Sequence, residues 1–110
     1  MKNFQQDGTR KKWTNGTGAD VTSGTMVKVG NRVGVCAVDI ANGASGTVVL
    51  VGVFSGITKL TADVVTEGVD LYWDDTNKRL TLTSTSNTLA GFAWAAADGS
   101  TAIVTIKINA

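Results

Sequence analysis

The feature that most constrains the fold is a run of alternating side chains on both sides of a polar turn, from Gly68 to Leu82. A strand has a period of two residues, so alternation buries one face and leaves the other in water. The expected apolar face consists of Val69, Leu71, Trp73, Leu80 and Leu82. Residues 75–78 supply the turn, in which Asn77 is expected to take the left-handed conformation that asparagine tolerates. The stretch therefore predicts a β-hairpin that forms one wall of the core.

Other stretches also have strand character, and the 13 glycines and the absence of proline favour strands joined by tight turns. We expect further strands at 26–29, 32–38, 47–54, 89–95 and 102–108. Both alternating sets of 47–54 are apolar, which predicts a central strand covered on both faces. A helix is plausible only at 61–68, where Thr61 could cap it and Gly68 could end it. The predicted fold is all-β, a small barrel or sandwich with at most one short helix.

Large and small side chains alternate within 89–95. Phe92 and Trp94 point to one side, and Gly91, Ala93 and Ala95 point to the other. The small side lets another backbone come close. It is either packed in the core of one chain, which we favour, or a contact between subunits.

The first 20 residues differ from the rest of a chain whose length predicts one domain. Residues 1–20 are interpreted as an extended, polar arm and residues 21–110 as the β domain. The notable side chains of the arm are Lys2, Phe4, Arg10, Lys11, Lys12 and Trp13. The arm is either a disordered tail or a segment that becomes ordered on a partner, with Phe4 and Trp13 as anchors. The two aromatics favour the second interpretation once a partner is present.

Residue types that most enzymes need are missing. The chain has no histidine, so the commonest general base and metal ligand is absent. The single cysteine, Cys36, lies in an apolar stretch and is interpreted as a buried structural thiol. We therefore expect neither catalysis nor a cofactor.

The carboxylates of the predicted hairpin form the main alternative site. Asp70 and Asp74 are four residues apart on one strand, roughly 13 Å, which is too far for a pair of glycosidase carboxylates. Asp74, Asp75 and Asn77 could surround a calcium ion, although they lack the pattern of an EF-hand. We interpret these residues as a solvated strand face and a turn, and expect no metal site. The remaining alternative is a carbohydrate- or metal-binding module that uses Asp70, Tyr72, Asp74 and Asp75.

The charge balance and the length of the apolar runs give no reason to expect nucleic acid or a membrane as the partner. Ten basic residues against nine acidic ones give no general reason to expect nucleic acid. The longest apolar run, 48–54, is too short to cross a membrane. No apolar run begins the chain, so we expect synthesis in a reducing cytoplasm.

The order of several short motifs resembles a family of small phage capsid cement proteins, also called head decoration proteins. The motifs are Lys2-Asn3-Phe4 with Gln6 and Gly8, Val21-Thr22-Ser23-Gly24 followed by 27–30, Gly34-Val35, Gly52-Val53-Phe54, Leu71-Tyr72-Trp73-Asp74, Asn87, Gly91-Phe92-Ala93 and an alternating Ile/Val end. The resemblance extends along nearly the whole chain.

The resemblance implies a structural virion protein, made in the bacterial host cytoplasm, that attaches to the outside of the assembled head. It implies a β-tulip-like fold similar to that of the lambda head decoration protein. Such proteins sit as homotrimers that bridge neighbouring major capsid subunits. Their N-terminal arm contacts the capsid, and here that arm carries Lys2, Phe4, Arg10, Lys11, Lys12 and Trp13.

Overall fold

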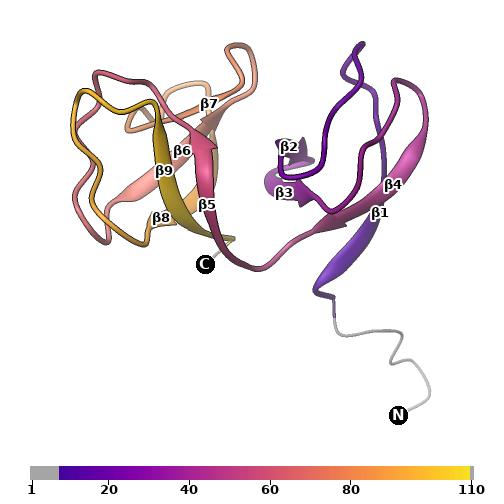
Figure 1. Cartoon of the computed structure of the whole chain (residues 1–110), viewed down its shortest axis with the longest axis horizontal. Coiled ribbons are helices and arrows are strands. Elements are labelled where there is room, and N and C mark those ends of the chain that lie inside the picture. Colours follow the sequence, from indigo (N-terminus) through magenta and orange to yellow (C-terminus); the bar gives the residue numbers. More distant parts are fainter. Residues whose placement is uncertain (1–7, 110) are drawn as a thin grey trace.

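A computed structural model describes residues 8–109 as two antiparallel β-sheets that pack against each other (Figure 1). The N-terminal sheet has the strand order β1–β4–β3–β2, with bounds β1 Arg10–Thr14, β2 Met26–Val29, β3 Arg32–Cys36 and β4 Ser45–Val49. The C-terminal sheet has the order β5–β9–β8–β6–β7, with bounds β5 Gly52–Thr58, β6 Asp70–Asp74, β7 Arg79–Thr81, β8 Thr88–Ala93 and β9 Ile103–Ile108. The all-β prediction is confirmed, and the two sheets stay open rather than closing into one barrel.

The predicted hairpin is present as β6 and β7. Leu71, Trp73 and Leu80 are fully buried, while Val69 and Leu82 are partly buried against the same cluster. The left-handed residue of the turn is Lys78, with φ of 55°, and not Asn77 as predicted. The Asp74 carboxylate accepts hydrogen bonds from the backbone N–H of Asn77 and from its side chain, and so holds Asn77 one position before the reversal.

The prediction of a single central strand at 47–54 is wrong. The chain leaves the N-terminal sheet after Val49 and enters the C-terminal sheet at Gly52. Both alternating sets of side chains are apolar because the first part of the run packs in one hydrophobic cluster and the second part packs against another. Val48 packs in one cluster and Phe54 packs against the other.

The segment 61–68, the one place where the sequence made a short helix plausible, is not helical, and residues 8–109 contain no helix, hence none that could span a membrane. Val65 instead forms an antiparallel bridge with Ala97, with N–H to carbonyl distances of 2.8 and 2.9 Å in the two directions. β-branched Val64 and Val65 suit this extended backbone better than a helix. The loop between Lys59 and Val65 is held by the Lys59 ammonium, which donates hydrogen bonds to the carbonyls of residues 60, 61 and 63.

The N-terminal sheet is apolar on both faces. One face carries Met26, Val33 and Val35 into the main core between the sheets. The other face carries a second cluster, here called the outer cluster, made of Val27, Cys36, Ile40 and Val48. The predicted small residues Gly91 and Ala93 are buried within the chain, where β9 passes close to β8, and Ala95 lies beyond β8 and is exposed.

Candidate functional site

Strand β1 contains the basic half of the predicted arm. Arg10–Thr14 pairs with β4 from Arg10↔Val49 to Thr14↔Ser45, at one edge of the N-terminal sheet. Lys2 and Phe4, the other two predicted contact residues, lie outside the described residues. The structure thus brings together four of the six predicted residues, on one edge strand.

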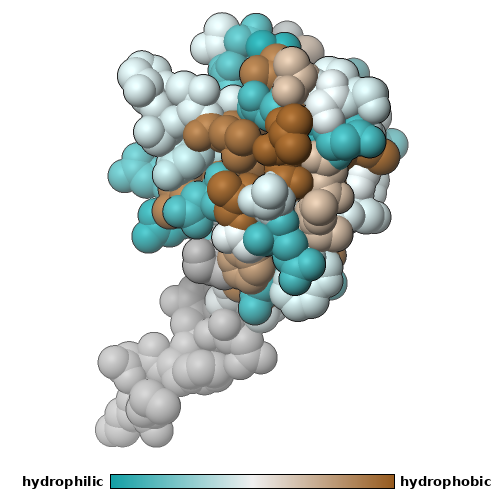
Figure 2. Space-filling model, turned by 90° about the vertical axis from the view of Figure 1, so that its left-hand side faces the viewer, coloured by the Kyte–Doolittle hydropathy of each residue, from teal (hydrophilic) through white to brown (hydrophobic). Residues whose placement is uncertain are grey.

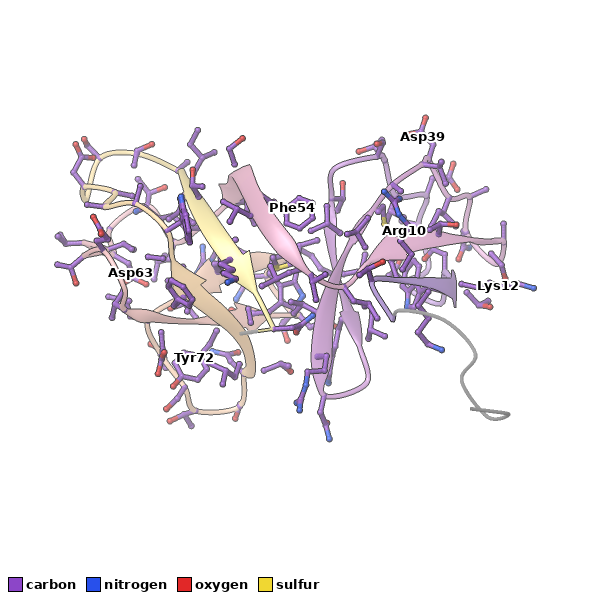
Figure 3. The ribbon with its side chains drawn as sticks, turned by 90° about the horizontal axis from the view of Figure 1, so that it is seen from below. Arg10, Lys12, Asp39, Phe54, Asp63 and Tyr72 are labelled. Carbon is purple, nitrogen blue, oxygen red and sulfur yellow. The ribbon has the colours of Figure 1, made fainter. Side chains whose placement is uncertain are left out.

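The three cations of β1 are exposed and divided between the two faces of the strand. Directly opposed residues of an antiparallel pair share a face. Lys11, opposite Val48, therefore lies on the face of the outer cluster, while Arg10 and Lys12 lie on the other face. In Figure 3 Arg10 and Lys12 lie at the end of the molecule opposite Asp63 and Tyr72.

The outer edge of β1 has no neighbouring strand among the described residues. The Leu50 N–H donates to the Thr9 carbonyl, and the Asn15 N–H donates to the Ala44 carbonyl, both at 2.8 Å. Because bonding direction alternates along an antiparallel strand, the backbone groups of Arg10 and Lys12 point away from β4. Within the described part of the chain, this edge therefore offers backbone donors and acceptors that no strand pairs with, between two cationic side chains.

Trp13 attaches β1 to its own sheet. Its ring is half-buried and packs against the outer cluster. The next residues form a tight loop around Asn15, whose side chain is completely buried. Asn15 Nδ2 donates to the carbonyls of Ala19 and Ile40 at 2.8 and 2.9 Å, and Oδ1 accepts from the Thr17 N–H and hydroxyl. The strand is held at its C-terminal end by packing and by these four bonds.

Charge is unevenly divided between the two halves of the molecule. Residues 8–50 carry five Lys or Arg and two Asp, whereas residues 51–109 carry four Lys or Arg and six Asp or Glu. The half that presents β1 is therefore net positive and the other half is net negative. A surface of net positive charge is electrostatically complementary to an acidic surface, and here that charge lies on the half that contains the N-terminal sheet.

The hairpin carboxylates bond to their own turn. Hydrogen bonds from the Asn77 side chain and backbone lower the pKa of Asp74. Burial raises the pKa of Asp75, but hydrogen bonds from Lys78 and Trp73 outweigh it and leave that pKa lowered overall. The Lys78 Nζ lies 2.9 Å from Asp75 Oδ1. Within residues 8–109 no three acidic or thiol side chains gather as a metal site would require.

A crevice of about 390 Å³ lies between the two halves, next to the hairpin. Its lining includes the apolar residues Met26, Ile57 and Trp73 and the charged residues Asp75 and Lys78. Asp70, Tyr72 and Asp74 are not among its lining residues. The four residues of the alternative carbohydrate or metal site are therefore not gathered around one cavity.

Cys36 is buried in the outer cluster, and burial raises the pKa of its thiol. A thiol with a raised pKa is a weak nucleophile at neutral pH. The interpretation as a structural thiol is consistent with this position.

Comparison with known proteins gives one match. Searches of curated proteins and of solved structures each found no match. A scan against protein families matches the phage cement protein family over residues 5–108, which is nearly the whole chain and includes both sheets. The chain therefore belongs to the phage cement protein family, whose members are structural proteins of the phage capsid.

Proposed function

We propose that this cement protein binds the outer surface of the assembled phage head as a homotrimer and bridges neighbouring major capsid subunits. The residues proposed to contact the capsid are Lys2, Phe4, Arg10, Lys11, Lys12 and Trp13. The observation that carries the proposal is an exposed, cationic edge strand on the positive half of a family member. The protein acts through binding alone, without catalysis or cofactor, and without nucleic acid or membrane as partner.

Three copies of a weak contact are sufficient for tight attachment. If each arm bound with a Kd of about 10 µM at an effective concentration of about 1 mM, a trimer would bind with a Kd near 1 nM. Only positions that present three correctly spaced capsid sites would be occupied. The protein would thus stabilise the completed shell and ignore dispersed capsid subunits.

The test is binding of the purified protein to expanded, undecorated heads, measured by co-sedimentation and electron microscopy. The double variant Arg10→Glu/Lys12→Glu reverses two exposed charges on β1 and leaves the Trp13 packing intact. The matched control, Lys28→Glu/Arg32→Glu, makes the same charge change near the opposite edge of the same sheet. We expect the β1 variant to lose binding and the control to retain it.

Deletion of residues 2–8 tests the first part of the segment without removing β1. We expect this protein to fold, to give a wild-type circular dichroism spectrum and to bind heads at least tenfold more weakly, as loss of one or two contact residues would cause. Full head binding by both the deletion and the β1 variant would refute the proposed contact residues. Absence of binding by the wild-type chain would refute the capsid-surface proposal.

A further inference from the structure

The outward face of the C-terminal sheet exposes large apolar side chains. Val53, Leu89, Trp94 and Ile103 are 43–53% exposed. The half-buried ring of Phe92 lies 6.2 Å from that of Trp94. Figure 2 shows apolar side chains gathered near the middle of the end of the molecule that this sheet forms. Aromatic residues on an exposed apolar surface are typical of protein–protein interfaces.

The register places the centre of this face in one row. Val53 is opposite Lys107, Lys107 is opposite Phe92, and Phe92 is opposite Asp70, across β5, β9, β8 and β6. The neighbouring row, which contains Phe54, Ile106 and Ala93, points into the core. The alternation therefore directs all four of these side chains outward, with Lys107 and Asp70 on the two sides of Phe92 and Val53 beyond Lys107.

We propose that this face, here called the outward face, packs against the outward faces of two further copies of the chain. The proposal rests on the homotrimer of the proposed function and names the surface that forms it. Phe92 and Trp94 of three copies would converge around an axis that runs roughly along the strands, and Val53, which lies beyond Lys107, would be covered at the border between two copies. The basic β1 edge would remain free, because it belongs to the other sheet.

The charges on the two sides of Phe92 favour a second copy as the occupant. Asp70 lies on the β6 side of Phe92, and Lys107 lies on the β9 side. Within residues 8–109 neither side chain forms an ion pair or a side-chain hydrogen bond. In a closed ring with Phe92 nearest the axis, the Asp70 side of each copy faces the Lys107 side of the next, so Asp70 would meet the Lys107 of its neighbour. A face with opposite charges on the two sides of its aromatic centre is complementary to the same face of another copy.

The first experiment compares molecular mass in solution, by analytical ultracentrifugation, for the wild-type chain and two matched variants. Val53→Asp adds a charge to the outward face, and Val38→Asp adds the same charge to the N-terminal half, at a valine of similar exposure, 48% against 43%. We expect a trimer for the wild type and for Val38→Asp, and a monomer for Val53→Asp. A wild-type monomer, or a Val53→Asp trimer, would overturn the proposal.

The second experiment exchanges the two charges. Asp70→Lys and Lys107→Asp should each raise the concentration at which the trimer forms, by about tenfold, since each opposes like charges at three contacts. The double variant should restore assembly to near the wild-type concentration. Additive weakening in the double variant would show that the two residues do not meet across the interface.

Binding to heads separates this inference from the proposed function. The monomeric Val53→Asp variant keeps the β1 edge, so it should bind heads about 10⁴-fold more weakly than the trimer through a single arm. A trimer that fails to bind heads would refute the proposed function and leave the outward face as the subunit interface. A wild-type chain that binds heads while remaining a monomer would refute the inference and the homotrimer of the proposed function, and would leave head binding through β1 standing.

Discussion

Asn109 joins the two sheets through Val33, a residue 76 positions away in the sequence. The Asn109 Nδ2 donates to the Val33 carbonyl at 2.8 Å and to the Leu50 carbonyl at 2.7 Å, and its Oδ1 accepts from the Val33 N–H at 3.3 Å. Asn109 itself has a left-handed backbone, with φ of 55°. The side chain therefore links the end of β9 both to β3 and to the crossing between the sheets.

Substitution of Asn109 by glycine should weaken the contact between the sheets. Glycine keeps the left-handed backbone, so the change removes only the side-chain bonds. Three partly buried hydrogen bonds predict a loss of about 2 kcal/mol in the free energy of unfolding, measured by urea denaturation. The control Asn31→Gly, at an exposed turn, should change stability by about 0.5 kcal/mol or less. Equal effects of the two substitutions would contradict a joining role for Asn109.

Substitution of Lys59 by methionine should be strongly destabilising. Lys59 is 2% exposed, and its ammonium donates to three carbonyls, the shortest bond being 2.7 Å to that of Asp63. Methionine keeps most of the stem and removes the ammonium donor from all three carbonyls, so we expect a loss of about 3 kcal/mol. Lys28→Met, on an exposed residue of β2, serves as the control and should be nearly neutral. Near-wild-type thermal stability of Lys59→Met would rule out this role.

Substitution of Gly91 by alanine should disrupt the pairing of β8 with β9. A Cβ at this position would lie 2.0 Å from the Lys107 carbonyl oxygen, and φ of 152° adds strain for any other residue. The backbone of a paired strand cannot move aside, so the expected loss is on the order of 4 kcal/mol or more. Gly16→Ala, which would meet no atom within 4 Å, is the matched control. A folded Gly91→Ala protein with unchanged amide protection in β9 would contradict the predicted clash.

The hairpin turn should loosen in acid. The folded pKa of Asp74 lies below its ordinary value of 3.8. A lowered pKa means that the carboxylate stabilises the fold at pH above its ordinary value, and that this contribution is lost as pH falls through the folded pKa. The Asn77 amide resonance should therefore titrate with a midpoint below 3.8 in NMR spectra. In Asp74→Asn the titration should disappear; a midpoint at or above the ordinary value would argue against the hydrogen bonds.

The hairpin at 68–82 could be predicted from the sequence because its buried face follows from a period of two residues. The prediction of the left-handed turn residue was wrong, because a side-chain hydrogen bond determines which residue takes that conformation. Asp74 holds Asn77 and moves the left-handed residue to Lys78. The prediction of one central strand at 47–54 was wrong because a continuous apolar run is expected for two different structures. One is a strand buried on both faces, and the other is a segment that leaves one sheet and enters the next.

Within the candidate site, the sequence indicated a basic segment but not its attachment to the fold. Residues 10–14 alternate too little to predict a strand, since three consecutive cations precede Trp13. The Asn-x-Thr spacing at 15–17 could have indicated an Asx turn. The bond from Asn15 to the Ile40 carbonyl joins residues 25 apart, and no local signal predicts such a contact.

The attachment of β1 also has a mechanical consequence. A pull directed along β1 from its N-terminal end would load the bonds between β1 and β4 in parallel, so that they shear together instead of opening one after another. Trp13 and Asn15, at the far end of the strand, would resist that sliding. If the head is bound through β1 as proposed, tension in the shell would enter the N-terminal sheet along its most resistant direction.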